Sequence, residues 1–187
     1  MVLYRRNLVP GASYFFTLTL RDRSSDILVR HAKLLKLAFR SVRRERPFEI
    51  DAIVVLPEHL HCIWTLPPAD ADYPACWQAI KARFSRTVRE AGEPLRRDAK
   101  GNCELWQPRY WEHTLRDDED FARHVDYIHF NPVKHGWVDR AAHWPLSSFA
   151  RYVERGIYPV DWGLAAEPIS RAGERIPDAN PGFFRYQ

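Results

Sequence analysis

The hydrophobic and polar positions of this chain follow two periodicities, one typical of strands and the other of helices. Runs rich in aromatic and β-branched residues predict four strands, at residues 14–20, 48–56, 59–66 and 105–115. Only Pro57 and Glu58 separate the second strand from the third, so we expect these two strands to form a hairpin. Pro108 interrupts the fourth strand, because proline has no amide hydrogen to give to a sheet.

Between the strands, apolar residues recur every three or four positions, which predicts helices. The first helix follows Asp26, a residue type favoured at N-caps, and its apolar face runs from Ile27 to Phe39. The second helix covers residues 74–91, and its buried face is expected to carry Trp77, Ile80, Phe84 and Val88.

A third helix is expected to follow a cap at Asp117 and to run to about Asn131, with Pro132 marking its end or a sharp kink. A short further helix is expected near Leu146. The resulting order, β-α-β-β-α-β-α, predicts an α+β fold. We expect a ferredoxin-like antiparallel sheet with helices on one face and an added C-terminal helix that carries the nucleophile discussed below.

The composition indicates a globular protein rather than a disordered or membrane-spanning one. With 187 residues, 45% of them hydrophobic and 13% aromatic, the chain is long enough to bury a core. We expect one domain over residues 1–155 and an irregular tail over residues 156–187. No apolar run approaches the roughly 20 residues of a membrane helix, and the three cysteines lack C-x-x-C spacing. A cytoplasmic protein without membrane contact is therefore the expectation.

The charge of the chain is mildly basic and unevenly distributed. Lys and Arg total 28 against 24 acidic residues, which gives a net charge of +4. Many of the basic residues fall within two segments, 21–46 and 81–100. Such clusters favour a polyanionic partner, but two solvated helix faces would produce the same pattern.

The third predicted strand contains the sequence His59-Leu60-His61. Because side chains alternate along a strand, both imidazoles should project from one face, where they can converge on a divalent ion. Two half-exposed histidines without a ligand would show the same spacing, so the pair alone is weak evidence. Glu58 would point away from such a site if the strand began before it.

The third predicted helix has a polar stripe beside its apolar one. At about 100° per residue, Phe121, Val125 and Ile128 form the stripe expected to face the core. A second, narrow stripe beside it consists of Asp120, His124, Tyr127 and Asn131. A tyrosine that served only in packing would be expected in the apolar stripe, so the pattern favours a functional role for Tyr127.

Together these residues have the chemistry needed to attack a phosphodiester. A phenol with a reference pKa of about 10 needs a metal or a base to act as a nucleophile at neutral pH. A cation held by His59, His61 and the Asn131 amide would polarise the phosphate oxygens, and Tyr127 could then attack in line. The products would be a phosphotyrosine link and a free 3′ hydroxyl, with the bond energy conserved.

The residues just described resemble those of the REP-associated tyrosine transposases, bacterial single-tyrosine members of the HUH (His-hydrophobic-His) nuclease superfamily. His59-Leu60-His61 matches the HUH motif, and residues 127–134, Tyr-Ile-His-Phe-Asn-Pro-Val-Lys, are similar to the tyrosine helix of the family. Flanking segments also resemble the family, and the similarity extends from about Tyr4 to Tyr152.

The resemblance implies a metal-dependent transposase that cleaves and rejoins single-stranded DNA through a 5′-phosphotyrosine intermediate. It implies Mg²⁺ or Mn²⁺ as cofactor, His59, His61 and Asn131 as ligands, and Tyr127 as nucleophile. Related small transposases have Gln where this chain has Asn131, and His124 is the second candidate for that ligand position. The implied substrate is a palindromic hairpin with a GTAG-like foot, and the implied state is a monomer rather than a dimer, associated with the bacterial nucleoid.

Two other functions remain open at this stage. One is a hairpin-binding protein without cleavage in vivo, and the other is a metallohydrolase that uses activated water, with Tyr127 only orienting the substrate. DNA contacts are expected from five basic residues, Lys81, Arg83, Arg86, Arg109 and Lys134. Most of the seven Trp residues are expected in the core.

Overall fold

A computed structural model describes residues 6–99, 101 and 103–164 of the chain. Its centre is a four-stranded antiparallel sheet in the order β2-β3-β1-β4. The strands are β1 (Ser13–Thr19), β2 (Glu49–Val55), β3 (His59–Thr65) and β4 (Trp111–Thr114). This order confirms the predicted ferredoxin-like α+β fold, including the β2–β3 hairpin.

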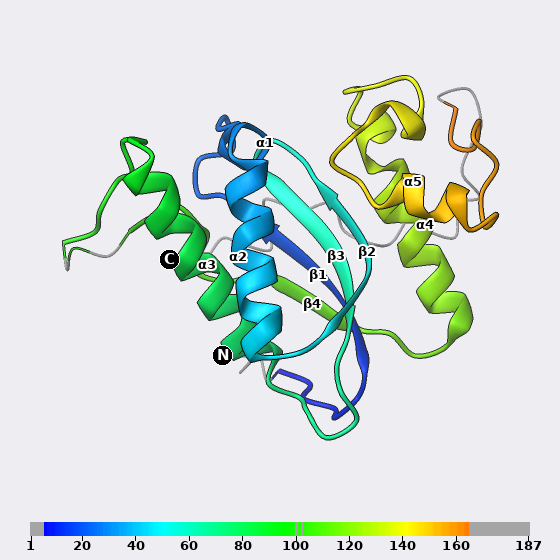
Figure 1. Cartoon of the computed structure of the whole chain (residues 1–187), viewed down its shortest axis with the longest axis horizontal. Helices are drawn as coiled ribbons and strands as arrows, with labels where there is room; N and C mark the ends of the chain where they lie inside the picture. The colour runs from blue at the N-terminus through cyan, green and yellow to red at the C-terminus, as the bar shows by residue number, and fades with distance from the viewer. Residues whose placement is uncertain (1–5, 100, 102, 165–187) are drawn as a thin grey trace, which may run out of the picture.

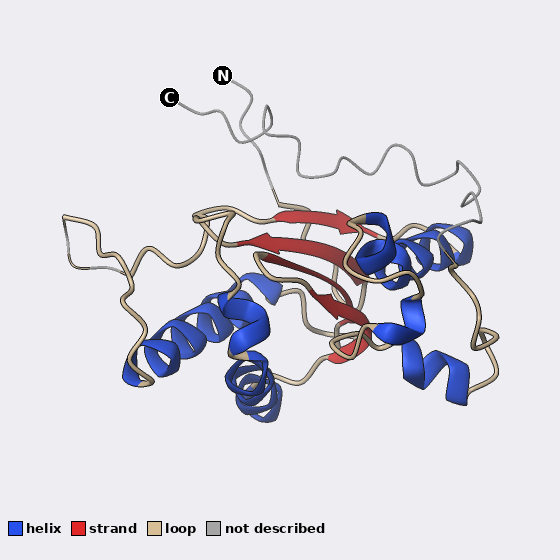
Figure 2. Ribbon diagram, turned by 90° about the horizontal axis from the view of Figure 1, so that it is seen from above, coloured by secondary structure: helices blue, strands red, loops and turns tan. Residues whose placement is uncertain are grey.

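Helices cover both faces of the sheet. Figure 1 shows α2 and α3 on one side, and α4 with α5 on the other, and Figure 2 shows the same arrangement from above. The helical elements are α1 (Ile27–Arg30), α2 (Ala32–Glu45), α3 (Tyr73–Glu90), α4 (Asp118–Lys134), the 3-10 turn η1 (Ala141–His143) and α5 (Phe149–Glu154). Among the described residues, none of these helices is long and apolar enough to cross a membrane.

The two faces of β3 enter different hydrophobic cores, as the alternation of its side chains predicts. Leu60, Cys62 and Trp64 belong to the core under α2 and α3, where the Trp64 ring stacks on Trp77 with centroids 4.1 Å apart. Ile63 belongs to the second core, under α4. His59 and His61 therefore lie on the α4 side of the sheet.

Two predicted elements differ from the structure. The first helix is divided at His31 into α1 and α2, and the Asp26 side chain makes no capping hydrogen bond; it pairs with Arg30 instead. The fourth strand is confined to Trp111–Thr114, with only an isolated bridge between Leu20 and Trp106 before it. The missing amide hydrogen of proline explains why a continuous ladder does not form across residue 108.

Helix α4 continues through Pro132 to Lys134, so the prediction that it ends near Asn131 was wrong. His135 is the C-cap of the helix, and Gly136 follows it with φ +70°. The amide of Gly136 donates to the carbonyl of Val133, and the amide of Trp137 donates to the carbonyl of Pro132, both at 2.9 Å. This pair of bonds is a Schellman motif, which satisfies carbonyls at the helix end.

The segment after α4 closes over the edge strand β2. The Ser148 hydroxyl accepts a hydrogen bond from the amide of Ile53 at 2.9 Å and is 2.8 Å from Nε2 of His129, a buried α4 residue. From residue 156 to Leu164, within the segment expected to be an irregular tail, Tyr158 and Trp162 stack on Phe149 of α5. The rest of that predicted tail, residues 165–187, lies outside the described part of the chain.

The N-terminal end of α4 is anchored by a buried carboxylate. Asp117 caps the helix, as predicted, by accepting from the amide of Asp120 at 2.8 Å. The Asp120 carboxylate in turn accepts hydrogen bonds from Nε2 of His113 at 2.9 Å and from Nε of Arg116 at 3.0 Å. His113 lies on β4, so this carboxylate connects the start of α4 to the sheet.

We predict that Asp120→Asn lowers the free energy of unfolding by about 1–3 kcal/mol at pH 7, because it weakens buried charged hydrogen bonds. Burial opposes ionisation, yet the hydrogen bonds from Arg116 and His113 hold the pKa of Asp120 well below its usual range. A lowered carboxylate pKa stabilises the fold above the unfolded-state pKa of about 3.9, and this contribution is lost as the pH falls.

Urea unfolding of wild type and Asp120→Asn at pH 7, 5 and 3.5 measures this contribution. The difference between the two proteins should be similar at pH 7 and 5 and smaller at 3.5. Asp118→Asn, which changes an exposed carboxylate in the same helical turn, is the matched control and should have little effect. A difference that grows with acidification would contradict the assignment.

Candidate active site

The two histidines of the His59-Leu60-His61 sequence lie side by side at the start of β3. Their ring centroids are 4.9 Å apart, and both side chains are buried beneath α4. In the sheet, His59 pairs with Thr19 and His61 with Thr17 of the central strand β1. The expected projection from one face is therefore observed, but the histidines are more buried than half-exposed surface residues would be.

Each histidine has a hydrogen-bond partner on Nδ1. The Glu58 carboxylate accepts from Nδ1 of His59 at 2.9 Å, and the Thr17 hydroxyl is 2.8 Å from Nδ1 of His61. These bonds occupy Nδ1 and orient both rings, so Nε2 is the ring nitrogen that could bind a metal. A carboxylate or hydroxyl behind a histidine is the usual support of a metal ligand.

The electrostatics favour a neutral imidazole at His61. Burial, and then the neighbouring His59 and His135, lower the pKa of His61 well below its usual range. A neutral ring keeps a lone pair available for a cation. Burial raises the pKa of Glu58, but the hydrogen bond from His59, together with the positive charge of His59 and of Arg23, more than offsets it and lowers this pKa, so the carboxylate remains an acceptor.

Helix α4 brings a second set of residues to these histidines. The Tyr127 ring centroid is 5.2 Å from that of His61, and the His135 ring is 5.3 Å from His59, two helical turns further on. Asn131 lies between them on α4 and is fully buried, and among the described residues neither its Oδ1 nor its Nδ2 has a hydrogen-bond partner. An unpaired buried carboxamide is costly, and Asn131 lies on the helix one turn from Tyr127 and one turn from His135, the two residues whose rings lie beside the histidines.

This donor set fits a divalent cation. Two neutral imidazoles and an amide oxygen supply three ligands, and the remaining positions of a cation would be open to water or phosphate oxygens. The unpaired Asn131 carboxamide is the observation that supports this fit, because coordination through Oδ1 would satisfy a buried acceptor. His59, His61 and Asn131 are the residues that would hold the ion.

His124, the second candidate for the third ligand, lies in a different cluster. Its ring stacks on His113 with centroids 5.0 Å apart, and its Nδ1 donates to the backbone carbonyl of Asp120 at 2.7 Å. The potential ligand atoms of these three residues lie within 4.8 Å of one another. The polar stripe of α4 is thus divided, its first half facing β4 and its second half facing β3.

The five basic residues expected to contact DNA have different surroundings. Arg83 ties α3 to α2 through Ser41 and Glu45, so its charge is already paired. Lys134 places its ammonium nitrogen 5.2 Å from the centroid of the Tyr127 ring. Arg109 is exposed in the loop before β4. Lys81 and Arg86 lie on one side of α3.

Sequence reasoning missed three residues that complete this site: Thr17, Glu58 and His135. The strand begins at His59, so Glu58 lies in the preceding turn and reaches the adjacent imidazole. Glu58 was expected to point away from the site only if the strand began before it, and the strand does not. The register of β1 against β3 could have pointed to Thr17, and the helical continuation past Pro132 could have pointed to His135.

Comparisons with known proteins agree with this geometry. Residues 9–131 match the family model described as transposase IS200 like. The chain is 48% identical over 173 residues to a REP-associated tyrosine transposase of Escherichia coli (strain K12), covering 92% of this chain and 97% of that protein. It is 40% identical over 162 residues to a Haemophilus influenzae relative given the same family name, covering 86% and 92% respectively.

A solved structure gives the same result in three dimensions. A REP-associated tyrosine transposase bound to a REP hairpin matches with a TM-score of 0.78 and 47% identity, covering 95% of this chain and 99% of that one. The family model spans well over half of the chain, and the relatives match nearly all of it. The chain therefore belongs to the IS200-like transposase family and, within it, to the REP-associated tyrosine transposases.

Proposed function

We propose that this transposase cleaves and rejoins single-stranded DNA with Tyr127 as its nucleophile and with a divalent cation held by His59, His61 and Asn131. The observation that carries the proposal is the convergence of the Tyr127 ring, 5.2 Å from His61, with a buried Asn131 carboxamide that has no partner. Mg²⁺ or Mn²⁺ fits these ligands when water and phosphate oxygens complete the shell.

In the proposed reaction, the Tyr127 oxygen attacks the phosphorus and loses its proton as the new bond forms. The bond from phosphorus to the 3′ oxygen breaks, and that oxygen leaves as a 3′ hydroxyl after taking up a proton. The DNA 5′ phosphate remains esterified to Tyr127, so a 3′ hydroxyl can reverse the step without an energy source. The bound cation would supply charge stabilisation at the non-bridging oxygens, and the Lys134 ammonium adds positive charge beside the phenol.

We infer that the substrate is DNA with palindromic hairpins, because the closely matching relative was solved on a REP hairpin. The excess of basic residues supports a polyanionic partner. A monomer suffices for this chemistry, because both histidines and Tyr127 meet within one chain. The proposal implies a cytoplasmic protein with access to the nucleoid.

The first prediction concerns the covalent intermediate. Incubation of wild type with a hairpin oligonucleotide labelled at its 3′ end and Mn²⁺ should give a protease-sensitive, slowly migrating band on a denaturing gel, because the fragment 3′ of the cleaved bond stays on the protein. Tyr127→Phe should abolish this band, because the ring is retained but the attacking oxygen is lost. EDTA should abolish it in wild type as well.

Two outcomes, one on this denaturing gel and one on a parallel native gel, would contradict the proposal. Strand scission by both proteins without an adduct would assign the activity to a metallohydrolase that uses water. A retarded band on a native gel without any scission would leave a hairpin-binding protein.

A second prediction separates chemistry from binding. His61→Ala should lose cleavage and keep most of its DNA affinity, since the cation acts at one phosphate while basic residues contact many. Fluorescence anisotropy of a labelled hairpin, with circular dichroism to check the fold, measures this. Loss of binding by a folded His61→Ala protein would show that the histidine serves recognition instead.

A third prediction concerns Glu58, which orients His59. Glu58→Gln keeps the side-chain size but replaces the charged acceptor, and it should weaken Mn²⁺ binding by about 10- to 100-fold, as is typical for the partner of a metal-ligating histidine. Isothermal titration calorimetry of Mn²⁺ binding checks this without relying on activity. Glu49→Gln, an exposed carboxylate at the far end of the hairpin, is the control and should bind Mn²⁺ as wild type does. Equal affinities for all three proteins would refute a role for Glu58 in metal binding.

A further inference from the structure

A second group of side chains able to bind a metal lies outside the catalytic site, between β4 and the first two turns of α4. It consists of His113, Asp120 and His124, and we call it the α4–β4 cluster. One nitrogen of each imidazole and one carboxylate oxygen lie within 4.8 Å of one another. Figure 1 shows the loop after β4 leading directly into α4, which brings the strand residue to the two helix residues.

The helix places two of these residues on one face. Asp120 and His124 are four positions apart on α4, the spacing at which zinc-binding helices carry a pair of ligands. Nε2 of His113 is 2.9 Å from Oδ2 of Asp120, and Nδ1 of His124 is 3.3 Å from Oδ1. Tetrahedral ligands at about 2.1 Å from a zinc ion lie roughly 3.4 Å apart. The carboxylate is therefore already at ligand distance from both imidazoles.

Burial distinguishes this cluster from an ordinary surface pair. Asp120 is 2% exposed and His124 is 4% exposed, while His113 is half-buried. Burial lowers the pKa of His124, which keeps a lone pair available for a metal. Burial opposes ionisation of Asp120, but hydrogen bonds from Arg116 and His113 hold its pKa well below the usual range. Two neutral imidazoles and a carboxylate suit Zn²⁺ and leave a fourth position for water.

His113 is the residue that has to move when a metal binds. Its ring stacks on that of His124, 19° from parallel with centroids 5.0 Å apart, and on that of Trp111 at 5.8 Å. Lone pairs lie in the ring plane, so two stacked imidazoles do not point at a common ion. The side chain of His113 is 29% exposed, and a rotation of this ring directs it at the ion without unpacking the core.

The charges around the cluster favour a cation, although two arginines lie beside it. Residues 117–120 are four consecutive acids at the cap and first turn of α4. They outweigh Arg116, Arg123 and the helix N-terminus, which carries about half a positive charge. Arg123 also pairs with Glu119. Arg116 donates to Asp120 at 3.0 Å, but its side chain is 68% exposed, so it competes for the carboxylate and can turn into solvent.

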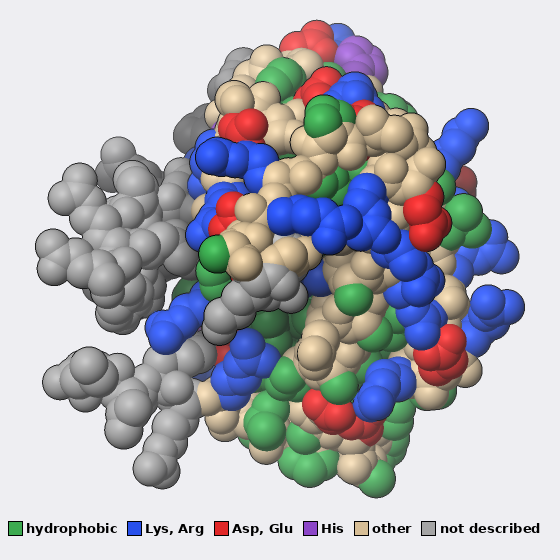
Figure 3. All heavy atoms as spheres, turned by 90° about the vertical axis from the view of Figure 1, so that its left-hand side faces the viewer, with side chains coloured by type: hydrophobic (Ala, Val, Ile, Leu, Met, Phe, Trp, Pro, Cys, Tyr) green, Lys and Arg blue, Asp and Glu red, His purple; other side chains and the backbone are tan. Residues whose placement is uncertain are grey.

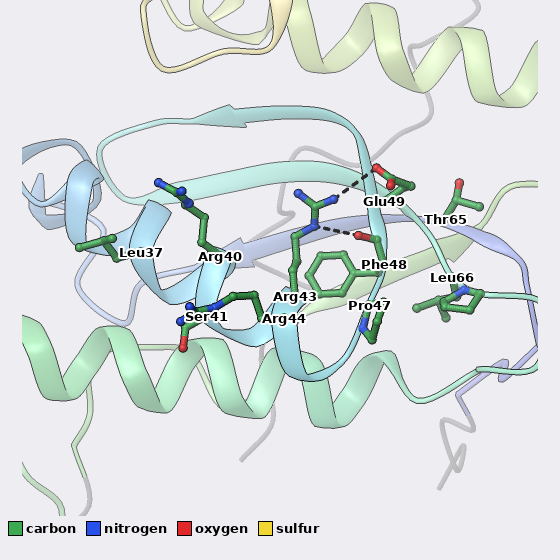
Figure 4. A pocket seen from close by; sticks show the side chains of 11 residues that line it. Leu37, Arg40, Ser41, Arg43, Arg44, Pro47, Phe48, Glu49, Thr65 and Leu66 are labelled. Carbon is green, nitrogen blue, oxygen red and sulfur yellow. Dashed lines mark hydrogen bonds and ion pairs between the residues drawn. The ribbon is translucent and has the colours of Figure 1, made fainter.

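Two large cavities elsewhere in the described chain have the opposite character. One of about 720 Å³ is lined by residues of α2 and of the ends of β2 and β3 (Figure 4), and the other, of about 550 Å³, lies beside α3. Figure 3 views the molecule from the side of the C-terminal part of α3 and shows Lys and Arg side chains gathered there. Both cavities repel a metal ion because basic residues line them, namely Arg40, Arg43 and Arg44 in the first and Arg21, Lys81, Arg86 and Arg89 in the second.

We propose that the α4–β4 cluster binds a transition metal ion of the Zn²⁺ class through His113, Asp120 and His124. Each imidazole then carries its proton on the nitrogen that does not bind the ion. The ion joins β4 to α4 by coordination where hydrogen bonds join them now, and it secures the helix that carries Tyr127. The site is separate from the cation site of the proposed function, and the assignment does not rest on that function, because it requires neither DNA nor cleavage.

Titration calorimetry of untagged, metal-stripped protein with Zn²⁺ tests this assignment. In a His61→Ala background, which disables the catalytic cation site, one equivalent should bind and raise the melting temperature. Adding His113→Gln should weaken this binding by more than about 100-fold, the upper end of the loss expected for a mere supporting partner. Glutamine keeps a donor for Asp120, so the fold should be retained.

His143→Gln is the matched control for His113→Gln. His143 forms an exposed pair with Asp139, also four residues away, with 2.8 Å between the ring nitrogen and the carboxylate. It is not part of the α4–β4 cluster. Zn²⁺ binding should therefore be unchanged in this variant. A loss in the control equal to that in His113→Gln would overturn the proposal.

Arg116→Gln has the opposite expected sign. It removes the competitor for Asp120 and should strengthen Zn²⁺ binding several-fold, whereas weaker binding in this variant would count against the site. A second readout uses Co²⁺, whose visible absorption reports a four-coordinate site. Wild type should bind two equivalents of Co²⁺, and His113→Gln alone should lose one equivalent together with that absorption.

Equal Zn²⁺ affinity with and without His113, or no binding in the His61→Ala background, would overturn the assignment. Neither result would affect the proposed function, because wild type would still form the Tyr127 adduct with DNA. Conversely, a wild type that forms no adduct but still binds Zn²⁺ through His113 would refute the proposed function alone.

Discussion

The candidate active site depends on the docking of α4 across the face of the sheet opposite α2 and α3. Val125 and Ile128 enter a core with Phe15 and Ile63, and this apolar contact provides the driving force. The polar stripe beside it is buried by the same contact, so α4 can dock only where the sheet offers partners for those groups. Hydrophobic burial brings the helix to the sheet, and the polar stripe determines which residues meet.

Both ends of α4 are fixed, and this holds Tyr127 in place. At the first turn, the Asp120 carboxylate connects the helix to His113 of β4. At the last turn, the Schellman motif at Gly136 ends the helix just after His135, whose ring lies beside His59. As the proposed nucleophile, a tyrosine in the middle of a helix secured at both ends would need little reorganisation before it reacts.

The sequence predicts most of this fold, because strand and helix periodicities are strong local signals. Alternation along β3 correctly assigns Leu60 and Cys62 to one core and His59 to the opposite face. Helical periodicity correctly assigns Asn131 to a stripe beside the apolar one, but it cannot name the partner of a polar residue. For this reason the sequence offers both Asn131 and His124 as the third metal ligand. Only the structure distinguishes them, because His124 stacks on His113 in a different cluster.

Partners contributed by turns and by sheet register are the least predictable part of the site. Glu58 supports His59 only because β3 begins one residue later, and a shift of one residue would reverse its direction. Thr17 supports His61 through strand register, which depends on residues far apart in the chain. Local pattern does not encode either contact, although both orient the two histidines of the candidate site.

Stability and function make opposite demands on Asn131. Its carboxamide is fully buried and unpaired, so the folded protein bears the cost of a desolvated polar group at the position where a cation would bind. An apolar residue would pack there at lower cost but could offer no ligand. The apolar contacts of docked α4 offset this cost. A bound cation would remove the cost by coordinating Oδ1. Ion binding and the stability of the α4 interface would therefore be thermodynamically linked. The anchoring at Asp120 and Gly136 is consistent with this reasoning, because a helix that carries a destabilising residue in its last turn needs secure contacts at its ends.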